Sequence, residues 1–228
     1  MAFKISTTLL LVIDVQNDFC PAYTSASGEH YPQGALAVQD GGGVIAPLNS
    51  LAKAVAAAGG WVAATQDWHP ARHSSFASAA SAASAHAGTK EEGLILWPDH
   101  CVQGKWGAAL HEKLDLRPVH LIIRKGFRPA LDSYSAFFEN DRKTPTGLGG
   151  WIRGLGIETV IIGGLATDYC VLYSAMDSNI MGLQTIIVED AVRGVDYPPG
   201  SLEKAIRQMK NAGITFAGSA ALLKELRQ

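Results

Sequence analysis

The chain of 228 residues is 47% hydrophobic and 18% charged, and its formal net charge is −2. This composition supports a packed core and excludes a disordered protein, and the lack of a basic stripe disfavours nucleic acid and anionic membrane as partners. The sequence has no run of about 18 apolar residues, so it predicts no transmembrane helix.

Six apolar stretches rich in β-branched residues predict strands, at residues 9–15, 61–65, 120–124, 159–163, 184–188 and 214–217. Helices are predicted at residues 43–58, 168–181, 201–211 and 219–226. The strands are continuously hydrophobic, which indicates that both faces are covered. We therefore expect one domain, residues 1–228, with a three-layer, doubly wound α/β fold. Its mainly parallel sheet has about six strands and carries helices on both faces.

Two segments break this alternation of strand and helix. Residues 66–118 contain five of the seven histidines, and residues 77–90 within them are rich in serine and alanine. A loop of this length in a compact domain is usually functional or disordered, so we expect a long metal-site loop here. The second segment, residues 126–147, either lines a pocket or packs over the core with its aromatic side chains, Phe127, Tyr134, Phe137 and Phe138.

Reactive side chains occur where four of the predicted strands end. Asp14 lies at the end of the first strand and Asp67 just beyond the second. Lys125 follows the third strand, and Cys170 comes shortly after the fourth. Ligands of an open parallel sheet bind beyond the carboxyl ends of its strands. We therefore expect these four side chains to meet at one edge of the sheet.

Cys170 is expected in the first turn of a helix, after two glycines, Gly163 and Gly164, that permit a tight turn. The positive helix end and a nearby Lys125 favour its thiolate, and backbone N–H groups of that turn can hold an oxyanion. A buried structural cysteine also fits the composition. Asp14 is either the general base for this thiol or a structural carboxylate, and Lys125 is either its ionic partner or a solvated lysine.

The segment Asp67-Trp68-His69 predicts a metal site. Residues i and i+2 of an extended chain point the same way, so Asp67 and His69 offer an oxygen and a nitrogen to one ion. His100 is expected to supply the third ligand. A mixed oxygen and nitrogen set that leaves positions open suits one divalent ion, Zn²⁺, Fe²⁺ or Mn²⁺, in a catalytic role.

Five segments resemble the nicotinamidases, also called pyrazinamidases, of the isochorismatase-like cysteine hydrolase superfamily. They are DVQNDF at 14–19, DWHP at 67–70, WPDHCV at 97–102, KGF at 125–127 and ATDYCV at 166–171. The resemblance runs from about residue 8 to the C-terminus. It implies a catalytic triad of Asp14, Lys125 and Cys170. It also implies three metal ligands, Asp67, His69 and His100.

The same resemblance implies further site residues. The substrate pocket would contain Phe19, Trp97, Tyr134, Ala166 and Tyr169. The oxyanion would be held by the amides of Ala166 and Cys170, beside a cis peptide bond at Leu165–Ala166. Some members of the family have an additional metal ligand, and three residues stay open for a place in the metal shell: His73, His86 and Ser75.

The implied activity is hydrolysis of nicotinamide to nicotinic acid and ammonia in NAD salvage, with pyrazinamide as a second substrate. Asp14 deprotonates Cys170, the thiolate attacks the carboxamide, and a metal-supported water hydrolyses the thioester. The alternatives are a carbamoyl- or maleamate-type amidase of the same superfamily and a non-catalytic binding module. Three widely spaced cysteines indicate a reducing, cytoplasmic location, and a homo-oligomer is possible.

Overall fold

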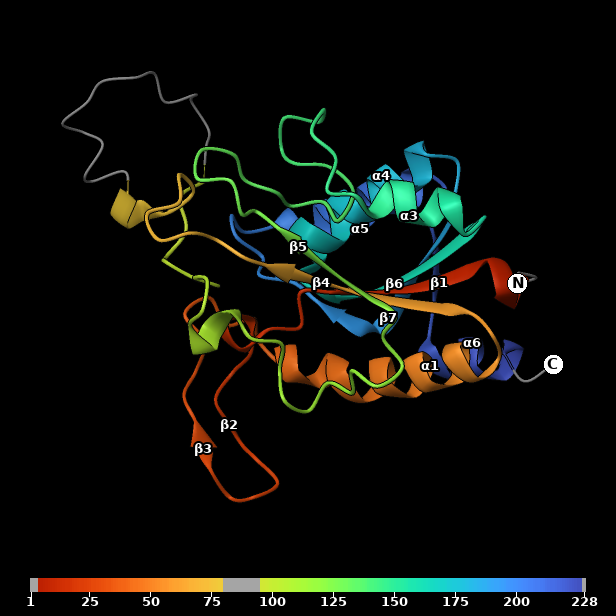
Figure 1. The fold of residues 1–228 in the computed structure, drawn as a ribbon, viewed down its shortest axis with the longest axis horizontal. Helices are drawn as coiled ribbons and strands as arrows, with labels where there is room; N and C mark the ends of the chain where they lie inside the picture. Colours follow the sequence, from red (N-terminus) through yellow and green to blue (C-terminus); the bar gives the residue numbers. More distant parts are fainter. Residues whose placement is uncertain (1–3, 80–94, 227–228) are drawn as a thin grey trace.

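The computed structural model describes residues 4–79 and 95–226, in which six strands form one parallel sheet (Figure 1). Their order is β5-β4-β1-β6-β7-β8. The strands are β1 Thr8–Ile13, β4 Trp61–Asp67, β5 Leu121–Lys125, β6 Thr159–Leu165, β7 Gln184–Arg193 and β8 Thr215–Ala217. The predicted doubly wound α/β fold is confirmed. His86 and residues 80–90 of the predicted serine- and alanine-rich segment lie outside the described residues.

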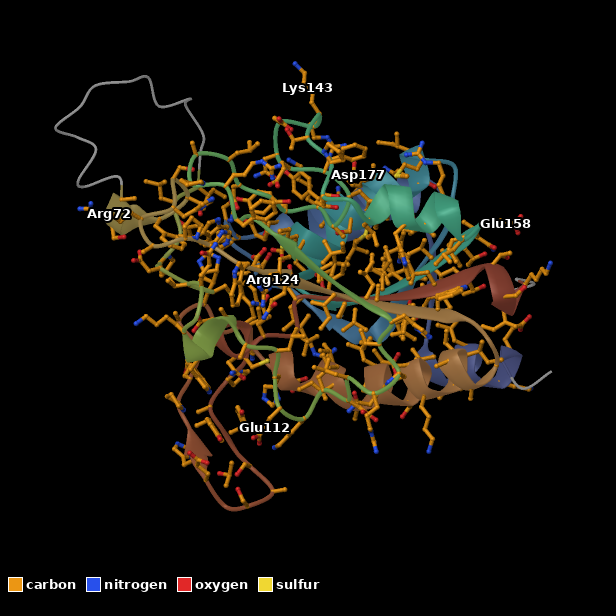
Figure 2. All side chains as sticks on the ribbon, in the orientation of Figure 1. Arg72, Glu112, Arg124, Lys143, Glu158 and Asp177 are labelled. Carbon is orange, nitrogen blue, oxygen red and sulfur yellow. The ribbon has the colours of Figure 1, made fainter. Side chains whose placement is uncertain are left out.

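Helices cover both faces of the sheet (Figure 1). One face carries α1 (Ile45–Ala57) and α6 (Ser219–Glu225), and the other carries α3 (Leu148–Gly154), α4 (Leu172–Ile180) and α5 (Ser201–Asn211). Side chains fill the space between the layers (Figure 2). Among the residues that the structure describes, no helix has the length and apolar character needed to cross a membrane.

Strand β1 shows why the predicted strands are continuously hydrophobic. Leu10 and Val12 belong to the core cluster that includes residues of α1 and α6. Leu9 and Leu11 belong to the second cluster, which includes residues of α3, α4 and α5. Successive side chains of a strand point to opposite faces, so a strand between two helical layers must be apolar on both.

The structure differs from the predicted elements where the local pattern is weak. Strand β1 ends at Ile13, because Asp14 has a positive φ of 46° and leaves the extended conformation. The predicted helix at 168–181 begins with a π-helical turn, Thr167–Val171. The hairpin of β2 (Tyr23–Thr24) and β3 (His30–Tyr31) was not predicted, since its strands are too short to show a period.

Other short elements also escaped prediction. Helix α3 has the sequence LGGWIRG, and its three glycines disfavour a helix when only the sequence is considered. Further helical segments are 3₁₀ turns at Ile5–Thr7, Asn17–Phe19, Gly41–Val44 and Trp106–Ala108. In segment 126–147, Phe137 is buried in the core, whereas Phe127 is 41% exposed. Both predicted uses of these aromatics therefore occur, because Tyr134 faces the pocket described below.

The strand order creates a crevice next to β1. The chain passes from β1 outward to β4 and β5 on one side, and then to β6, β7 and β8 on the other. Strands β1 and β6 are direct neighbours, with Ile13 opposite Gly164 at their carboxyl ends. Doubly wound sheets bind ligands at such a reversal of strand order. The site residues therefore have to be sought at this end of β1.

Buried His111 makes the stability of the fold depend on pH. Its ring lies 4.1 Å from the ring of Tyr23, and its Nδ1 accepts a hydrogen bond from the Lys113 N–H. Burial lowers the pKa of His111 to about 4, and the charge of Lys113 contributes. The unfolded chain has a histidine pKa of about 6.5 and so binds the proton first. Stability is therefore lost as the pH falls from about 6.5 to about 4.

We expect His111 to lower the free energy of unfolding by up to about 3 kcal/mol between pH 7 and pH 4. Urea denaturation at a series of pH values measures this slope. His111→Gln should flatten it, because glutamine does not titrate. The matched change His30→Gln, at an exposed histidine of β3, should leave the slope as it is. An unchanged slope in His111→Gln would contradict the assignment.

Candidate active site

Lys125 contacts the three other side chains that were predicted to meet with it at the sheet edge. It is the last residue of β5 and is fully buried. Its Nζ lies 2.9 Å from Asp14 Oδ2 and 3.3 Å from Cys170 Sγ, and it also forms an ion pair with Asp67. A further hydrogen bond goes to the carbonyl oxygen of Ser133. The structure therefore brings three side chains from other strand ends around one buried ammonium group.

The surroundings shift the pKa values of Lys125 and Asp14 away from their ordinary values. Burial lowers the pKa of Lys125, but Asp14 and Asp67 raise it more, and the balance is well above the ordinary value. Lys125 is therefore a cation. Burial raises the pKa of Asp14 by more than Lys125 lowers it, so this carboxylate is more basic than an ordinary aspartate.

The backbone and Thr65 hold Asp14 in a single orientation. Asp14 leaves β1 with a positive φ, and its N–H donates to the Thr65 hydroxyl at 3.0 Å. That hydroxyl in turn donates to Asp14 Oδ1 at 2.5 Å. The other carboxylate oxygen, Oδ2, is the one that faces Lys125. Asp14 is thus fixed by strand β4 on one side and by Lys125 on the other.

Cys170 lies in the π-helical turn between β6 and α4, and the cis peptide bond implied by the resemblance is present at Leu165-Ala166. Burial raises the pKa of the thiol, Lys125 lowers it and Asp14 raises it again, and the balance is well above the ordinary value. The favourable effect of Lys125 is thus present but is outweighed by burial. Asp14, whose own pKa is raised, lies beside the same ammonium group and is the predicted base for this thiol.

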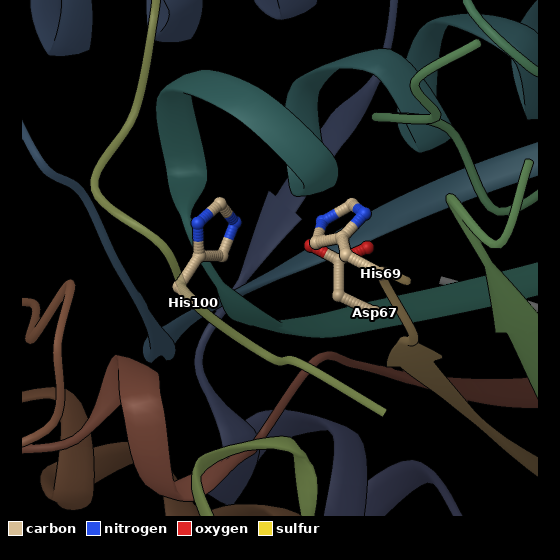
Figure 3. A group of neighbouring side chains, drawn as sticks. All are labelled: Asp67, His69 and His100. Carbon is tan, nitrogen blue, oxygen red and sulfur yellow. The ribbon is translucent and has the colours of Figure 1, made fainter. Parts of the chain in front are cut away.

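Asp67, His69 and His100 form a cluster in which the ligand atoms all lie within 4.8 Å of one another (Figure 3). Asp67 is the last residue of β4. The ring nitrogen Nδ1 of His69 is 2.8 Å from the Gly126 carbonyl, and Nδ1 of His100 is 2.7 Å from the Pro98 carbonyl. Each Nδ1 therefore donates a hydrogen bond to a carbonyl, which leaves Nε2 as the ring atom that can bind a metal ion. Nε2 of His69 lies 3.6 Å from Asp67 Oδ2, on the side of the cluster where the ion would lie.

Gly126 is required for this arrangement. It has a positive φ of 63°, and a Cβ atom there would lie 2.5 Å from Cε1 of His69. Any other residue would displace the ring that Gly126 holds through its carbonyl. Gly126 therefore has two roles: its positive φ permits the turn after β5, and its carbonyl and lack of a Cβ atom set the orientation of the His69 ring.

The protonation states in this cluster suit a metal ion. Burial raises the pKa of Asp67, but Lys125 and His69 lower it more, so Asp67 is a carboxylate. Burial lowers the pKa of His100, which keeps this imidazole neutral. In His69 the lowering by burial is outweighed by Asp67, so the pKa of this ring is raised. The charge of Asp67 thus favours a cation here, and a bound metal ion would take the place of the proton on His69 Nε2. One carboxylate oxygen and two imidazole nitrogens fit Zn²⁺, Fe²⁺ or Mn²⁺.

His73 and Ser75 lie beside the cluster, and His73 forms a second candidate ligand group with His69 and Asp132. Its Nδ1 accepts from the Ser75 N–H at 3.3 Å and lies 2.7 Å from the Ser75 hydroxyl. Its Nε2 lies 3.4 Å from the Leu131 carbonyl. Both ring nitrogens therefore have partners within the protein. Buried Phe76 packs edge-on against the rings of His69, His73 and His100, and sequence reasoning missed it.

The side chain of Gln16 holds the end of β4 in place. Its Nε2 donates to the Asp67 carbonyl at 2.8 Å, and its Oε1 accepts from the Asp67 N–H at 2.8 Å. Strand β1 has already ended, so this carboxamide supplies the pairing that a further strand residue would give. Gln16 lies in the DVQNDF segment, but the sequence pattern did not indicate that it orients Asp67.

A pocket opens over these two clusters. Cys170, Asp67, His69 and His100 line it together with all five residues expected from the resemblance, Phe19, Trp97, Tyr134, Ala166 and Tyr169. Trp97 Nε1 donates to the Tyr134 hydroxyl at 3.1 Å, and the ring of Trp97 meets that of Tyr169 edge-on at 4.9 Å. Sequence reasoning missed three further lining residues, Leu36, Asp132 and Val195. Leu36 and Val195 lie in irregular segments without a motif.

Known proteins resemble this chain over nearly its whole length. Residues 8–221 match the family model described as Isochorismatase domain. The nicotinamidase of Escherichia coli K12 is 40% identical over 209 residues, which cover 91% of this chain and 92% of that protein. A nicotinamidase and pyrazinamidase of Acinetobacter baumanii gives a TM-score of 0.80 at 40% identity, over 95% of this chain and 98% of its own. The structure of a Pyrococcus horikoshii pyrazinamidase in complex with zinc gives a TM-score of 0.74 at 32% identity. The match covers 93% of this chain and 99% of that one.

Proposed function

Because the chain belongs to the isochorismatase domain family, we propose that it is a nicotinamidase, an amidohydrolase that converts nicotinamide to nicotinic acid and ammonia. One observation carries the proposal: the pocket that holds the Cys170 thiol also holds the Asp67, His69 and His100 cluster. The first group supplies a nucleophile for a carboxamide, and the second suits a ring nitrogen at the other end of the substrate. Pyrazinamide has the same two features and is a second substrate.

The proposed chemistry begins with Asp14 and Cys170. Asp14 removes the proton of the thiol, and the thiolate attacks the carboxamide carbon. The amides that stabilise the oxyanion are those of Ala166, just before the π-helical turn Thr167–Val171, and of Cys170 within it. This turn is called the nucleophile turn below. Collapse of this intermediate breaks the C–N bond, and Asp14 returns its proton to the departing ammonia. Water then hydrolyses the thioester, with Asp14 as the base, and Lys125 holds both Asp14 and the sulfur in place throughout.

The substrate is positioned by the pocket walls and by the metal-ligand cluster. Asp67, His69 and His100 would hold one divalent ion, which when bound supplies a Lewis acid for the pyridine nitrogen and so orients the carboxamide toward Cys170. The rings of Phe19, Trp97 and Tyr169 enclose a planar substrate. Zinc is the first ion to test, because a zinc complex is known for the Pyrococcus relative. Iron and manganese fit the same donor set.

Release of ammonia from nicotinamide tests the proposal. The purified enzyme should release one ammonia per nicotinamide, should lose this activity after treatment with a chelator, and should regain it when Zn²⁺ is added. Maleamate and an N-carbamoyl compound serve as comparison substrates for the alternative amidases. Turnover of either comparison substrate without turnover of nicotinamide would replace the proposal with one of those activities. No turnover of any of the three would favour a binding module.

The metal ligands can be tested apart from activity. Asp67→Ala and His100→Ala should each weaken metal binding by at least about 100-fold, because each removes one of three protein ligands. Metal analysis of protein purified without a histidine tag measures the bound ion. The matched change His120→Ala, at an exposed histidine before β5, should retain full occupancy. Full occupancy in Asp67→Ala or in His100→Ala would remove that residue from the ligand set.

We also propose a cytoplasmic location. Cys20, Cys101 and Cys170 are all free, and a reducing compartment would keep the nucleophile in its thiol form, which supports this proposal. The possible homo-oligomer stays a prediction, for which light scattering on the purified protein is the measurement.

A further inference from the structure

Asp168 lies two residues before Cys170 and takes no part in the chemistry proposed above. Its side chain is buried, with 5% of the residue exposed. Oδ1 accepts the N–H of Val195 at 2.9 Å, and Oδ2 accepts the N–H of Asp196 at 2.9 Å and the hydroxyl of Ser201 at 2.6 Å. All three donors lie 27 to 33 residues further along the chain. This carboxylate therefore joins the nucleophile turn to a distant segment.

That distant segment, residues 194–198, is called the strap below, and it contributes Val195 to the pocket wall. The ring of Tyr197 lies 6.2 Å from that of Trp97, and the Tyr197 carbonyl accepts a hydrogen bond from the hydroxyl of Tyr169. The strap is thus tied to the nucleophile turn at two neighbouring residues, Asp168 and Tyr169.

The contact requires a carboxylate and a close approach. Two consecutive backbone N–H groups each donate a hydrogen bond to a different oxygen of Asp168. A carboxylate can accept both hydrogen bonds, whereas a carboxamide can accept only one, because its NH₂ group is a donor. Gly194 permits the approach, because a Cβ atom there would lie 2.6 Å from Leu202 Cδ1 and 3.1 Å from Asp168 Oδ1. The strap and the start of α5 therefore both contact the nucleophile turn through the side chain of Asp168.

Loss of the carboxylate should disturb the strap more than the nucleophile turn. Within the turn, the N–H groups of Tyr169 and Val171 both donate to the Ala166 carbonyl at 3.1 Å. Cys170 is held in addition by Lys125. The N–H groups of the strap at residues 195 and 196 instead depend on Asp168. The wall of the pocket would therefore move while the reacting sulfur stays in place.

We propose that Asp168 is a positioning residue that sets substrate affinity by holding the strap, and with it Val195, against the aromatic wall of the pocket. This inference rests on the proposed amidase function. Asp168 does not reach the reacting atoms, so its loss should raise KM and leave kcat nearly unchanged. A residue that mattered only for folding would change the amount of active enzyme instead, which lowers kcat at constant KM.

The test compares Asp168→Asn with Asp190→Asn in nicotinamide hydrolysis. Asp168→Asn should raise KM about tenfold and change kcat less than about threefold, because charged hydrogen bonds are lost. Asp190 is the matched control, because its carboxylate also accepts a backbone N–H and a hydroxyl, both from Ser219, but does not line the pocket. Asp190→Asn should leave KM and kcat at the wild-type values. Calorimetric binding of nicotinamide to the Cys170→Ala protein, with and without Asp168→Asn, should show the same tenfold loss of affinity.

Two results would overturn the inference: an unchanged KM in Asp168→Asn, or a fall in kcat at constant KM. Should Asp168→Asn fail to fold, Ser201→Ala decides, because it removes one donor and keeps the carboxylate. Its KM should rise about twofold to threefold, and a KM equal to that of the wild type would contradict the inference. Failure of the proposed function would look different, since the wild-type enzyme itself would then release no ammonia from nicotinamide.

Discussion

Cys170→Ala should lower turnover of nicotinamide by at least about 10⁴-fold and should change its dissociation constant less than about threefold. The thiol is the nucleophile of the proposed reaction, and without it no other side chain is left to attack the carboxamide carbon. Most of the pocket does not depend on the sulfur, because Phe19, Trp97 and the cluster of Asp67, His69 and His100 come from other segments. Loss of chemistry without loss of binding is therefore the expected pattern.

Single-turnover assays and calorimetry measure the two quantities for Cys170→Ala. Cys20→Ala is the control, because it removes another buried thiol, one whose pKa burial raises to about 12. Its turnover should equal that of the wild type. Alkylation by iodoacetamide, followed by mass spectrometry, should modify Cys170 in the folded enzyme before Cys20 or Cys101, because only Cys170 of the three lines the pocket. Turnover by Cys170→Ala at the wild-type rate would exclude Cys170 as the nucleophile.

The sequence was sufficient to predict the sheet and the meeting point of four reactive residues. Each buried strand is a continuous apolar run, and the polar residue that ends the run marks the carboxyl end of a parallel strand. Asp67 and Lys125 are the last residues of adjacent strands and lie opposite each other in register. The topological rule for doubly wound sheets then puts Asp14 and Cys170 at the same edge, which is what the structure has.

The rest of the site depends on contacts that no local pattern encodes. Val195 reaches the pocket because β7 extends to Arg193, five residues past its predicted end, and because Asp168 binds the backbone that follows. Gln16 orients Asp67 through a side chain that replaces a strand. Each of these contacts joins residues far apart in sequence, and their hydrogen-bond geometry appears only when the fold is complete.

The state of the Cys170 thiol shows the same limit. The helix end and Lys125 were visible in the sequence, and both favour a thiolate. The extent of burial was not visible, and burial raises the pKa of the thiol more than Lys125 lowers it. The predicted role of Asp14 as the base for this thiol is therefore the part of the site on which the proposed reaction depends most.

Asp14→Asn should lower kcat by about 10³-fold, since general acid–base catalysis contributes effects of this size. Asp14 is 2.9 Å from Lys125 and is proposed both to take the thiol proton and to return it to ammonia. The matched control is Asp177→Asn on α4 (Figure 2), which removes another buried carboxylate with a cationic partner, Arg142. Measured per folded molecule, its kcat should equal that of the wild type.

The alkylation rate of Cys170 separates the two roles of Asp14. The charge of Asp14 and its hydrogen bond both raise the pKa of the thiol, after the larger effect of burial. Asparagine removes the charge, so the thiol should ionise more readily beside Lys125 and react with iodoacetamide at least as fast as in the wild type. Hydrolysis should nevertheless be lost, because no group remains to protonate the departing ammonia. Fast alkylation with lost hydrolysis would identify proton delivery as the step that requires Asp14. A kcat within about tenfold of the wild type would show that another group delivers the proton.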